Sequence, residues 1–380
     1  MRALIYTGAS LLALGAASTA YAQATVPAGC IGVTGNCSVI DSSGSNNSAT
    51  VDQSGGTGNV SDVFQDGENV TATVSQGADG NISNIDQTTT ALNPQNVVAD
   101  VTQVGGADSV VSQSSSGDDL DGMTAIINQN GASASDVAQI SINSNGPENF
   151  SATVNQTGDG HSSIITQADN AGGNNDGDLV ATIDQSGTGN SSDVNQVNRD
   201  QTATVLQTGD DNSSFVTQST GRGSDAVITQ TGDGNTSDVE QEGRNADAFV
   251  TQGGNDNQAF VAQTDLNANA DGRSDATITQ DGDNGIASVA KNAPDCLFYN
   301  FTFKGNVLFC RESYKNADAV KAHLENCGPA LGEFMNIAEL LRIEVHGPAA
   351  ELEQEGGGGA VVLAPLVYLV LPHRPLLARL

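Results

Sequence analysis

The chain has few of the residues from which globular cores are usually built. Its 380 residues include no Trp, and aromatic residues make up only 4%. Glycine is abundant, with 44 residues, and the formal net charge is −32 at neutral pH. Low hydrophobicity combined with high net charge is typical of disordered chains, unless the polar residues recur with a period that a repeat fold can stack.

Basic residues are also scarce, since 13 Lys and Arg stand against 45 Asp and Glu. Proteins that bind nucleic acid neutralise phosphates with clustered Lys and Arg. No such cluster is visible in the sequence, so we expect no nucleic-acid partner. Between Ala3 and the end of the repetitive region, the basic residues are Arg199, Arg222, Arg244, Arg273 and Lys291.

The five cysteines are odd in number and absent from the long middle of the chain. Cys30 and Cys37 are spaced to close a small loop in an oxidising compartment. No Cys-x-x-Cys pair occurs and the four histidines are scattered, which argues against a zinc site. The Gly-Asp turns lack the nonapeptide of calcium-binding β-rolls. We therefore expect no metal, no cofactor and no catalytic residue.

The amino terminus has the three parts of a secretory leader. Met1-Arg2 precedes an apolar run from Ala3 to Ala17, and residues 20–22 read Ala-Tyr-Ala, the cleavage pattern. Residues 1–22 are thus expected to be a signal peptide that sends the chain out of the cytoplasm. The apolar run is short for a bilayer, so we expect no integral membrane span.

Glutamines recur in pairs through the middle of the chain. Members of a pair are 10 to 12 residues apart, whereas the first members of successive pairs are 22 to 29 apart. A unit with one turn of nearly constant length and one of variable length is what a two-strand solenoid coil requires. The pairs are Gln53/Gln65, Gln76/Gln87, Gln103/Gln113, Gln129/Gln139, Gln156/Gln167, Gln185/Gln196, Gln207/Gln218, Gln230/Gln241 and Gln252/Gln263.

Each unit contains two segments with the period of a β-strand. Residues 203–207 read Ala-Thr-Val-Leu-Gln, which places Ala, Val and Gln on one face. Residues 212–218 place Asn, Ser, Val and Gln on one face, and turn residues such as 231–234 separate the segments of a unit. We predict an all-β fold, a β-solenoid with two strands per coil over residues 46–291, preceded by an N-terminal segment at 23–45.

Asn and Gln can face the interior of such a solenoid because its coils repeat. In stacked coils each side-chain amide can donate to one neighbouring amide and accept from the other. A polar low-complexity linker would not keep Val or Ile two places before each Gln. The side chains expected to form these ladders are Gln53, Gln65, Gln76, Asn81, Gln87, Gln156, Gln167, Gln185, Asn190, Gln196, Gln207, Asn212, Gln218, Gln230, Asn235, Gln241, Gln252, Asn257 and Gln263.

Residues 156–167 and 185–196 resemble the curlin repeat, Gln-x-Gly-x-x-Asn-x5-Gln, of curli fibre subunits. The resemblance extends over residues 46–291, although some copies have Asp108, Ala134 or His161 where Asn is expected. It implies a non-enzymatic structural subunit that leaves through the outer-membrane curli secretion machinery. It also implies self-association, together with related curlin subunits, into extracellular amyloid fibres (a pilus) for cell adhesion and biofilm matrix formation.

A soluble, monomeric β-solenoid adhesin is the alternative, favoured by the heavy negative charge and by the irregular inter-coil loops. Under either reading, outward-facing acidic residues would repel neighbouring chains and slow premature stacking in the periplasm. These residues are Asp62, Asp86, Asp159, Asp193, Asp233, Asp238 and Glu240.

The composition changes after Lys291, which stands where the next Gln is expected. Residues 295–303 and 307–314 read as aromatic strands, and 316–325 has helical periodicity. Residues 295–352 resemble the later half of the antibiotic-biosynthesis monooxygenase family of dimeric α+β barrels, on the motifs at 296–299, 311–314, 322–326 and 345–352.

That second resemblance implies an incomplete α+β ferredoxin-like segment at 292–355. It also raises the alternative of a monooxygenase-like enzyme, for which the opening strand and first helix of the barrel are missing. Residues 356–380 read as an apolar tail outside any folded domain. Their run at 360–371 is broken by Pro365 and too short to span a bilayer.

Overall fold

The computed structural model describes residues 24–90, 96–116, 122–141, 149–168, 177–219, 222–264, 274–291, 296–304, 307–314, 318–321, 339–344 and 366–370. The signal peptide expected at 1–22 lies outside these residues, as does most of the tail expected at 356–380.

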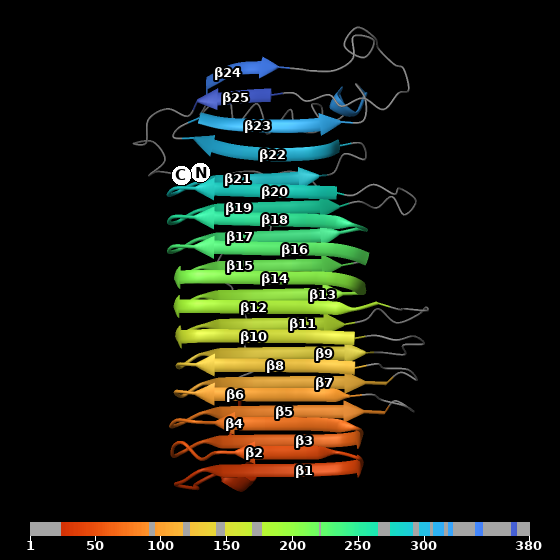
Figure 1. Ribbon diagram of the computed structural model, residues 1–380, viewed down its shortest axis with the longest axis vertical. Helices are drawn as coiled ribbons and strands as arrows, with labels where there is room; N and C mark the ends of the chain where they lie inside the picture. The colour runs from red at the N-terminus through yellow and green to blue at the C-terminus, as the bar shows by residue number, and fades with distance from the viewer. Residues whose placement is uncertain are drawn as a thin grey trace.

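The chain folds as an all-β, parallel β-solenoid in which successive strands alternate between two sheets (Figure 1). After a short 3-10 helix, η1 (Ala28–Cys30), the odd-numbered strands form one sheet, which we call sheet A. Its strands are β1 (Cys37–Ser45), β3 (Val60–Glu68), β5 (Ile82–Thr89), β7 (Asp108–Ser115), β9 (Ala134–Ser141), β11 (Ser162–Ala168), β13 (Ser191–Val197), β15 (Ser213–Ser219), β17 (Thr236–Glu242), β19 (Gln258–Thr264) and β21 (Ile286–Lys291).

The even-numbered strands begin the other sheet, sheet B, which ends in four strands from the C-terminal part of the chain. Its solenoid strands are β2 (Ser48–Asp52), β4 (Val70–Gln76), β6 (Val97–Val104), β8 (Gly122–Asn130), β10 (Asn149–Asp159), β12 (Leu179–Thr188), β14 (Arg199–Asp210), β16 (Arg222–Thr231), β18 (Ala246–Gly253) and β20 (Ser274–Asp281). The C-terminal strands are β22 (Cys296–Lys304), β23 (Val307–Tyr314), β24 (Glu339–Glu344) and β25 (Leu366–Val370), of which β22 pairs first.

Strand register explains why the repeats stack. Each strand of a coil pairs in parallel with the corresponding strand of the next coil, so Gln185, Gln207 and Gln230 lie in line across sheet B. Side chains alternate along each strand as the sequence predicts: in β14, Ala203 and Val205 are buried while their neighbours face outward. A parallel register with period 2 therefore sends the same residue types inward in every coil.

The core is a narrow column between the sheets. One cluster of buried Ala, Val and Ile side chains runs from Val63 to Val289 through all the intervening coils. A second column, at the N-terminal ends of strands β4 to β12 of sheet B, holds Val70, Val97, Met123, Phe150 and Leu179. Each coil contacts only its neighbours, so stability depends on the interfaces between coils, as in other repeat folds.

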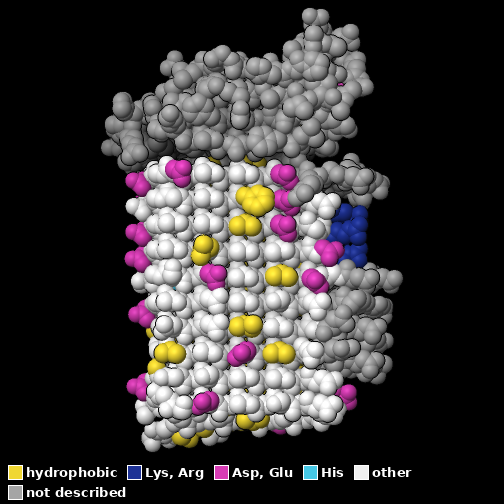
Figure 2. All heavy atoms as spheres, viewed as in Figure 1, with side chains coloured by type: hydrophobic (Ala, Val, Ile, Leu, Met, Phe, Trp, Pro, Cys, Tyr) yellow, Lys and Arg dark blue, Asp and Glu magenta, His cyan; other side chains and the backbone are white. Residues whose placement is uncertain are grey.

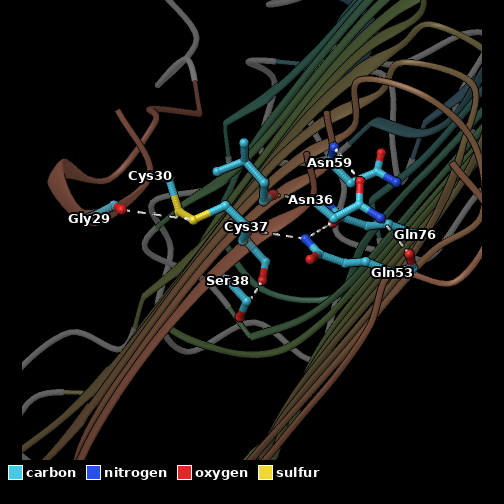
Figure 3. The surroundings of a disulfide bond; sticks show 10 residues. Gly29, Cys30, Asn36, Cys37, Ser38, Gln53, Asn59 and Gln76 are labelled. Carbon is cyan, nitrogen blue, oxygen red and sulfur yellow. Dashed lines mark hydrogen bonds between the residues drawn. A yellow bond between two sulfur atoms is a disulfide. The ribbon is translucent and has the colours of Figure 1, made fainter. Parts of the chain in front are cut away.

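The sheets begin earlier than the sequence suggests. Strand β1 pairs with β3 in register, with Ser42 opposite Gln65, so sheet A includes part of the segment at 23–45. The glutamine pattern does not mark this strand because Ser stands at the Gln position. The loop expected between Cys30 and Cys37 is confirmed, since the two residues form a disulfide beside β1 (Figure 3).

The C-terminal part differs from its prediction. The two aromatic strands are present as β22 and β23, but β22 pairs in parallel with β20 and therefore extends sheet B. The tail also contributes a strand, β25, which pairs antiparallel with β23 and β24. The described residues of this region do not show an α+β ferredoxin-like arrangement. In the part of the chain that is described, no helix has the length and apolar character needed to cross a membrane.

Candidate functional site: the stacked amide ladders

Two rows of buried glutamines run along the solenoid, one from each sheet. In both rows Nε2 of each Gln donates to Oε1 of the Gln in the next coil, at 2.8 to 3.0 Å. The row of sheet B contains Gln53, Gln76, Gln103, Gln129, Gln156, Gln185, Gln207, Gln230, Gln252 and Gln280. The row of sheet A contains Gln65, Gln87, Gln113, Gln139, Gln167, Gln196, Gln218, Gln241 and Gln263.

These glutamines also join the two sheets. An amide nitrogen carries two hydrogens, and only one is used along the row. The other points across the core: Nε2 of Gln207 lies 3.0 Å from the carbonyl oxygen of Ser191 in sheet A. Likewise Nε2 of Gln218 lies 3.0 Å from the carbonyl oxygen of Thr202 in sheet B. The rows thus satisfy buried polar groups in both directions, as a stable polar core requires.

A third row consists of asparagines at the start of the sheet A strands. Here Nδ2 of Asn212 donates to Oδ1 of Asn190, and Nδ2 of Asn235 to Oδ1 of Asn212, each at 3.0 Å. The direction of donation is from the later coil to the earlier one, opposite to that of the glutamine rows. A coil that stacks in the same orientation satisfies both kinds of row, whereas an inverted coil does not.

The asparagine row is interrupted in the middle of the solenoid, at other residues than the sequence suggests. Asp108 pairs with Ile82, so the residue in register with Asn81 is Ala107. In the next coil Ala134 pairs with Asp108, so Ser133 and not Ala134 stands at the asparagine position. In these coils the two glutamines are 10 positions apart instead of 11. The missing residue is absorbed in the turn because strand pairing keeps the second Gln in register.

His161 does occupy the asparagine position and is 1% exposed. Its Nε2 lies 3.0 Å from the carbonyl oxygen of Thr157, and its Nδ1 lies 3.3 Å from the backbone nitrogen of Asn190. A carbonyl only accepts and a backbone N–H only donates, so Nε2 carries the hydrogen and Nδ1 accepts. The ring therefore takes over part of the role of the amide.

A column of glycines lets the turns of nearly constant length stack closely. Gly187, Gly209 and Gly232 have φ of 110°, 113° and 103°, a region that favours glycine. A Cβ atom on any of them would overlap the backbone carbonyl of the next glycine in the column. Nearby aspartates hold these turns together: Oδ1 of Asp233 accepts a hydrogen bond of 2.9 Å from the backbone nitrogen of Asp210.

Acidic side chains spread over the outer surface, and the described Lys and Arg side chains in the same view gather at one edge (Figure 2). On sheet A the outward position of Asp193 lies in register between Ile164 and Phe215, and that of Asp238 lies between Phe215 and Phe260. Burial raises the pKa of the Asp193 carboxyl. Burial and, to a smaller extent, Glu240 raise the pKa of Asp238.

Two other carboxyls of sheet A share this behaviour. Burial raises the pKa of Asp108, while burial followed by repulsion from Asp41 and Asp86 raises the pKa of Asp62. A raised pKa in the folded state means that the ionised carboxylate opposes folding. The outer face of sheet A therefore carries charges that weaken the solenoid at neutral pH.

Acidification is expected to stabilise the solenoid. Because these pKa values lie above those of the unfolded chain, the folded state takes up protons first as the pH falls. The free energy of unfolding should then rise between neutral pH and about 4, the unfolded carboxyl pKa. The double variant Asp193→Asn, Asp238→Asn should be more stable than the parent at neutral pH and show a shallower pH dependence.

Denaturant unfolding across this pH range measures the effect. Asp100→Asn is the matched control, because Asp100 is an exposed residue of sheet B and its replacement removes charge without relieving burial. An Asp100→Asn effect as large as that of the sheet A variants, or a fall in stability on acidification, would contradict the role of burial.

The structure places every glutamine and asparagine of the sequence-based set in one of the three rows. The same rows contain Gln103, Gln113, Gln129 and Gln139, which that set does not include although their spacing marked them, together with Gln280. Asn36 and Asn59 extend the asparagine row toward the N-terminus, with the Asn59 backbone nitrogen 3.1 Å from Oδ1 of Asn36 (Figure 3). Among the described residues, no group of His, Cys, Asp or Glu is placed to hold a metal ion.

A family model described as the curlin associated repeat matches residues 199–232 and 221–254. These matches cover strands β14 to β18, where all three amide rows are continuous. No curated protein matches the chain. Neither comparison supports the resemblance of residues 295–352 to the monooxygenase family. Over residues 199–254 the chain is thus similar to curlin repeats, within a parallel β-solenoid.

Proposed function

We propose that this chain is a curli-type structural subunit, which joins extracellular amyloid fibres by stacking its coils end to end with those of other chains. The observation that carries the proposal is the pair of glutamine rows, which link successive coils by the same hydrogen bond from Gln53 to Gln280 in sheet B and from Gln65 to Gln263 in sheet A. Nothing in such a row limits the number of coils that it can join, because every added coil makes the same contact.

The N-terminal end of the solenoid supports this function because its interior is exposed among the residues that the structure describes. Ile40 is 48% exposed, although its register partner Val63 is 0% exposed. Gln53 uses its Nε2 to bond Gln76 and the carbonyl of Cys37, while its Oε1 receives no hydrogen bond from the residues that the structure describes. A further coil would bury Ile40 and supply the missing donor.

The proposed role has consequences for location and partners. The signal peptide would send the chain to the periplasm, and the curli secretion machinery of the outer membrane would export it. Its partners would be other copies and related curlin subunits, and the fibres would serve cell adhesion and the biofilm matrix. The role is structural rather than enzymatic, because the buried polar groups are used for stacking.

Assembly of residues 23–291 in buffer tests the proposal. The core cluster lies entirely within this segment, so it contains the packing that holds the coils together. We expect fibres that bind thioflavin and diffract at about 4.7 Å along the fibre axis, the spacing of stacked strands. A chain that stays monomeric and unordered would overturn the proposal, whereas a β-rich monomer in sedimentation would favour the adhesin.

A point variant identifies the contact that drives assembly. Gln53→Leu removes the free Oε1 at the open end, so elongation of 23–291 fibres should slow. Thr50→Ala is the matched control, since Thr50 is an outward residue of β2, the strand that ends just before Gln53, and takes no part in the rows. Equal elongation rates for the two variants would show that the glutamine row does not join chains.

A further inference from the structure

The two ends of the solenoid are built differently. At the N-terminal end, β1 and β2 are the edge strands of the two sheets and belong to one coil. The described residues before β1, 24–36, run along the outer face of sheet A. Thr25 lies along the outer face of sheet A, with its hydroxyl 3.0 Å from the side-chain amide of Asn84, and a Cβ at Gly29 would meet the outward-facing Val39 at 3.2 Å.

At the C-terminal end the sheets stop at different levels. Sheet A ends at β21, whereas sheet B continues through β22, β23, β25 and β24 in that order (Figure 1). Sheet B has 14 strands and sheet A has 11, so three additional strands at about 4.8 Å each displace the edge of sheet B by about 14 Å from that of sheet A. An incoming coil must pair with the edge strands of both sheets at once, but these two edges lie at different heights along the solenoid axis.

The pattern of pairing also changes at this end. Strand β22 is parallel to β20, but β23 pairs antiparallel with β22, and β24 and β25 are antiparallel as well. A parallel, in-register coil therefore cannot continue from the edge strand β24. In sheet A, Lys291 is the register partner of Gln263, so the amide row of that sheet has no further glutamine.

We propose that strands β22, β23, β24 and β25 form an end cap, so that this chain stacks through its N-terminal end only. The inference rests on the proposed function and refines it. The partner at the open end is a curlin-type solenoid whose last coil is uncapped. The direction of the glutamine rows requires this partner, because the free Oε1 of Gln53 needs an Nε2 donor, which the C-terminal coil of a parallel solenoid presents.

The consequence is that the chain terminates a fibre. Once its N-terminal end has docked on the last coil of a growing stack, the cap faces outward and growth stops at that end. A second copy cannot add there, because its own N-terminal coil finds no coil edge to pair with. Chains of this kind then limit fibre length instead of extending it.

Fibres of residues 23–291 provide the assay, with the mature full chain, 23–380, added in substoichiometric amounts. We expect the full chain alone to give no long fibres. When it is added during elongation, fibres should become shorter in proportion to its amount, with a gold-labelled C-terminus seen at one fibre end only. Seeded growth should be lost at that end and kept at the other.

A substitution in the full chain tests whether the cap strands are responsible. Thr302→Pro removes a backbone N–H within β22, between β20 and β23, and should detach the cap and restore elongation. Thr302→Ala should leave termination intact. Hydrogen exchange in β14 to β18 checks that both variants keep the solenoid, and the 23–291 chain gives the uncapped reference if Thr302→Pro does not fold.

The outcomes separate this inference from the proposed function. If 23–291 fails to assemble, the proposed function falls. If 23–291 assembles and the full chain elongates fibres equally well at both ends, the fibre role stands and the cap is overturned. Restored growth by Thr302→Pro but not by Thr302→Ala supports the cap, whereas termination that persists in Thr302→Pro contradicts it.

Discussion

Replacement of Gly209 by alanine is expected to lower the free energy of unfolding by about 3–5 kcal/mol, combining backbone strain with overpacking. Gly209 has φ of 113°, which an alanine adopts only with strain. The added Cβ would also overlap the carbonyl oxygen of Gly232 in the next coil. The neighbouring atoms are backbone, which cannot move aside without separating the coils.

Gly282→Ala is the matched control for this variant. Gly282 has φ of 125°, yet a Cβ there would meet nothing within 4 Å. It should therefore show only the strain, about 1–3 kcal/mol. Because long repeat arrays can unfold in parts, hydrogen exchange of the amides in β14 and β16 should accompany denaturant unfolding. Equal losses in the two variants would show that contact between turns contributes nothing.

Gln207→Leu is expected to cost about 3–5 kcal/mol, since a buried group left without its partner costs about 1–3 kcal/mol. Gln207 accepts from Nε2 of Gln185 and donates to Oε1 of Gln230, both at 2.8 Å. Leucine has nearly the same shape but can neither donate nor accept, so the sheet B row is interrupted on both sides of that coil. The same substitution should increase hydrogen exchange in β12, β14 and β16 more than elsewhere.

The end of the same row supplies the comparison. Gln53 has one glutamine neighbour, Gln76, and lies at the open N-terminal end. Gln53→Leu should therefore cost less than half as much as Gln207→Leu in denaturant unfolding of the monomer. Similar values at both positions would mean that stability comes from the bulk of the side chain and not from the row.

Much of the repeat architecture can be predicted from the sequence, because successive coils share a pattern of inward-facing and turn residues. The spacing of Gln207 and Gln218, with Val two places before each, is enough to place them inward on two strands of one coil. The same spacing marks the turn of nearly constant length between them. Register then follows, since a shift of one residue would turn buried Gln and Val outward in every coil.

Other features needed the pairing itself. Counting forward from Gln103 puts Asp108 at the asparagine position, but pairing of β5 with β7 puts Ala107 there. Strand β1 lacks Gln and so escapes a pattern defined by Gln. Strands β22 and β23 are expected from the sequence to belong to a separate α+β segment, yet β22 pairs with β20 and extends sheet B, because an exposed strand edge accepts any suitable strand.

The sequence by itself determined the period of the solenoid, the inward faces of its strands and the amide residues of its rows. These are local properties, and the same residue pattern recurs in each repeat. Only the tertiary structure decided the opposite directions of the Gln and Asn rows, the partial burial of the carboxylates on the outer face of sheet A and the difference between the two ends. These features depend on which strands pair across coils, and the sequence of a single repeat does not specify that pairing.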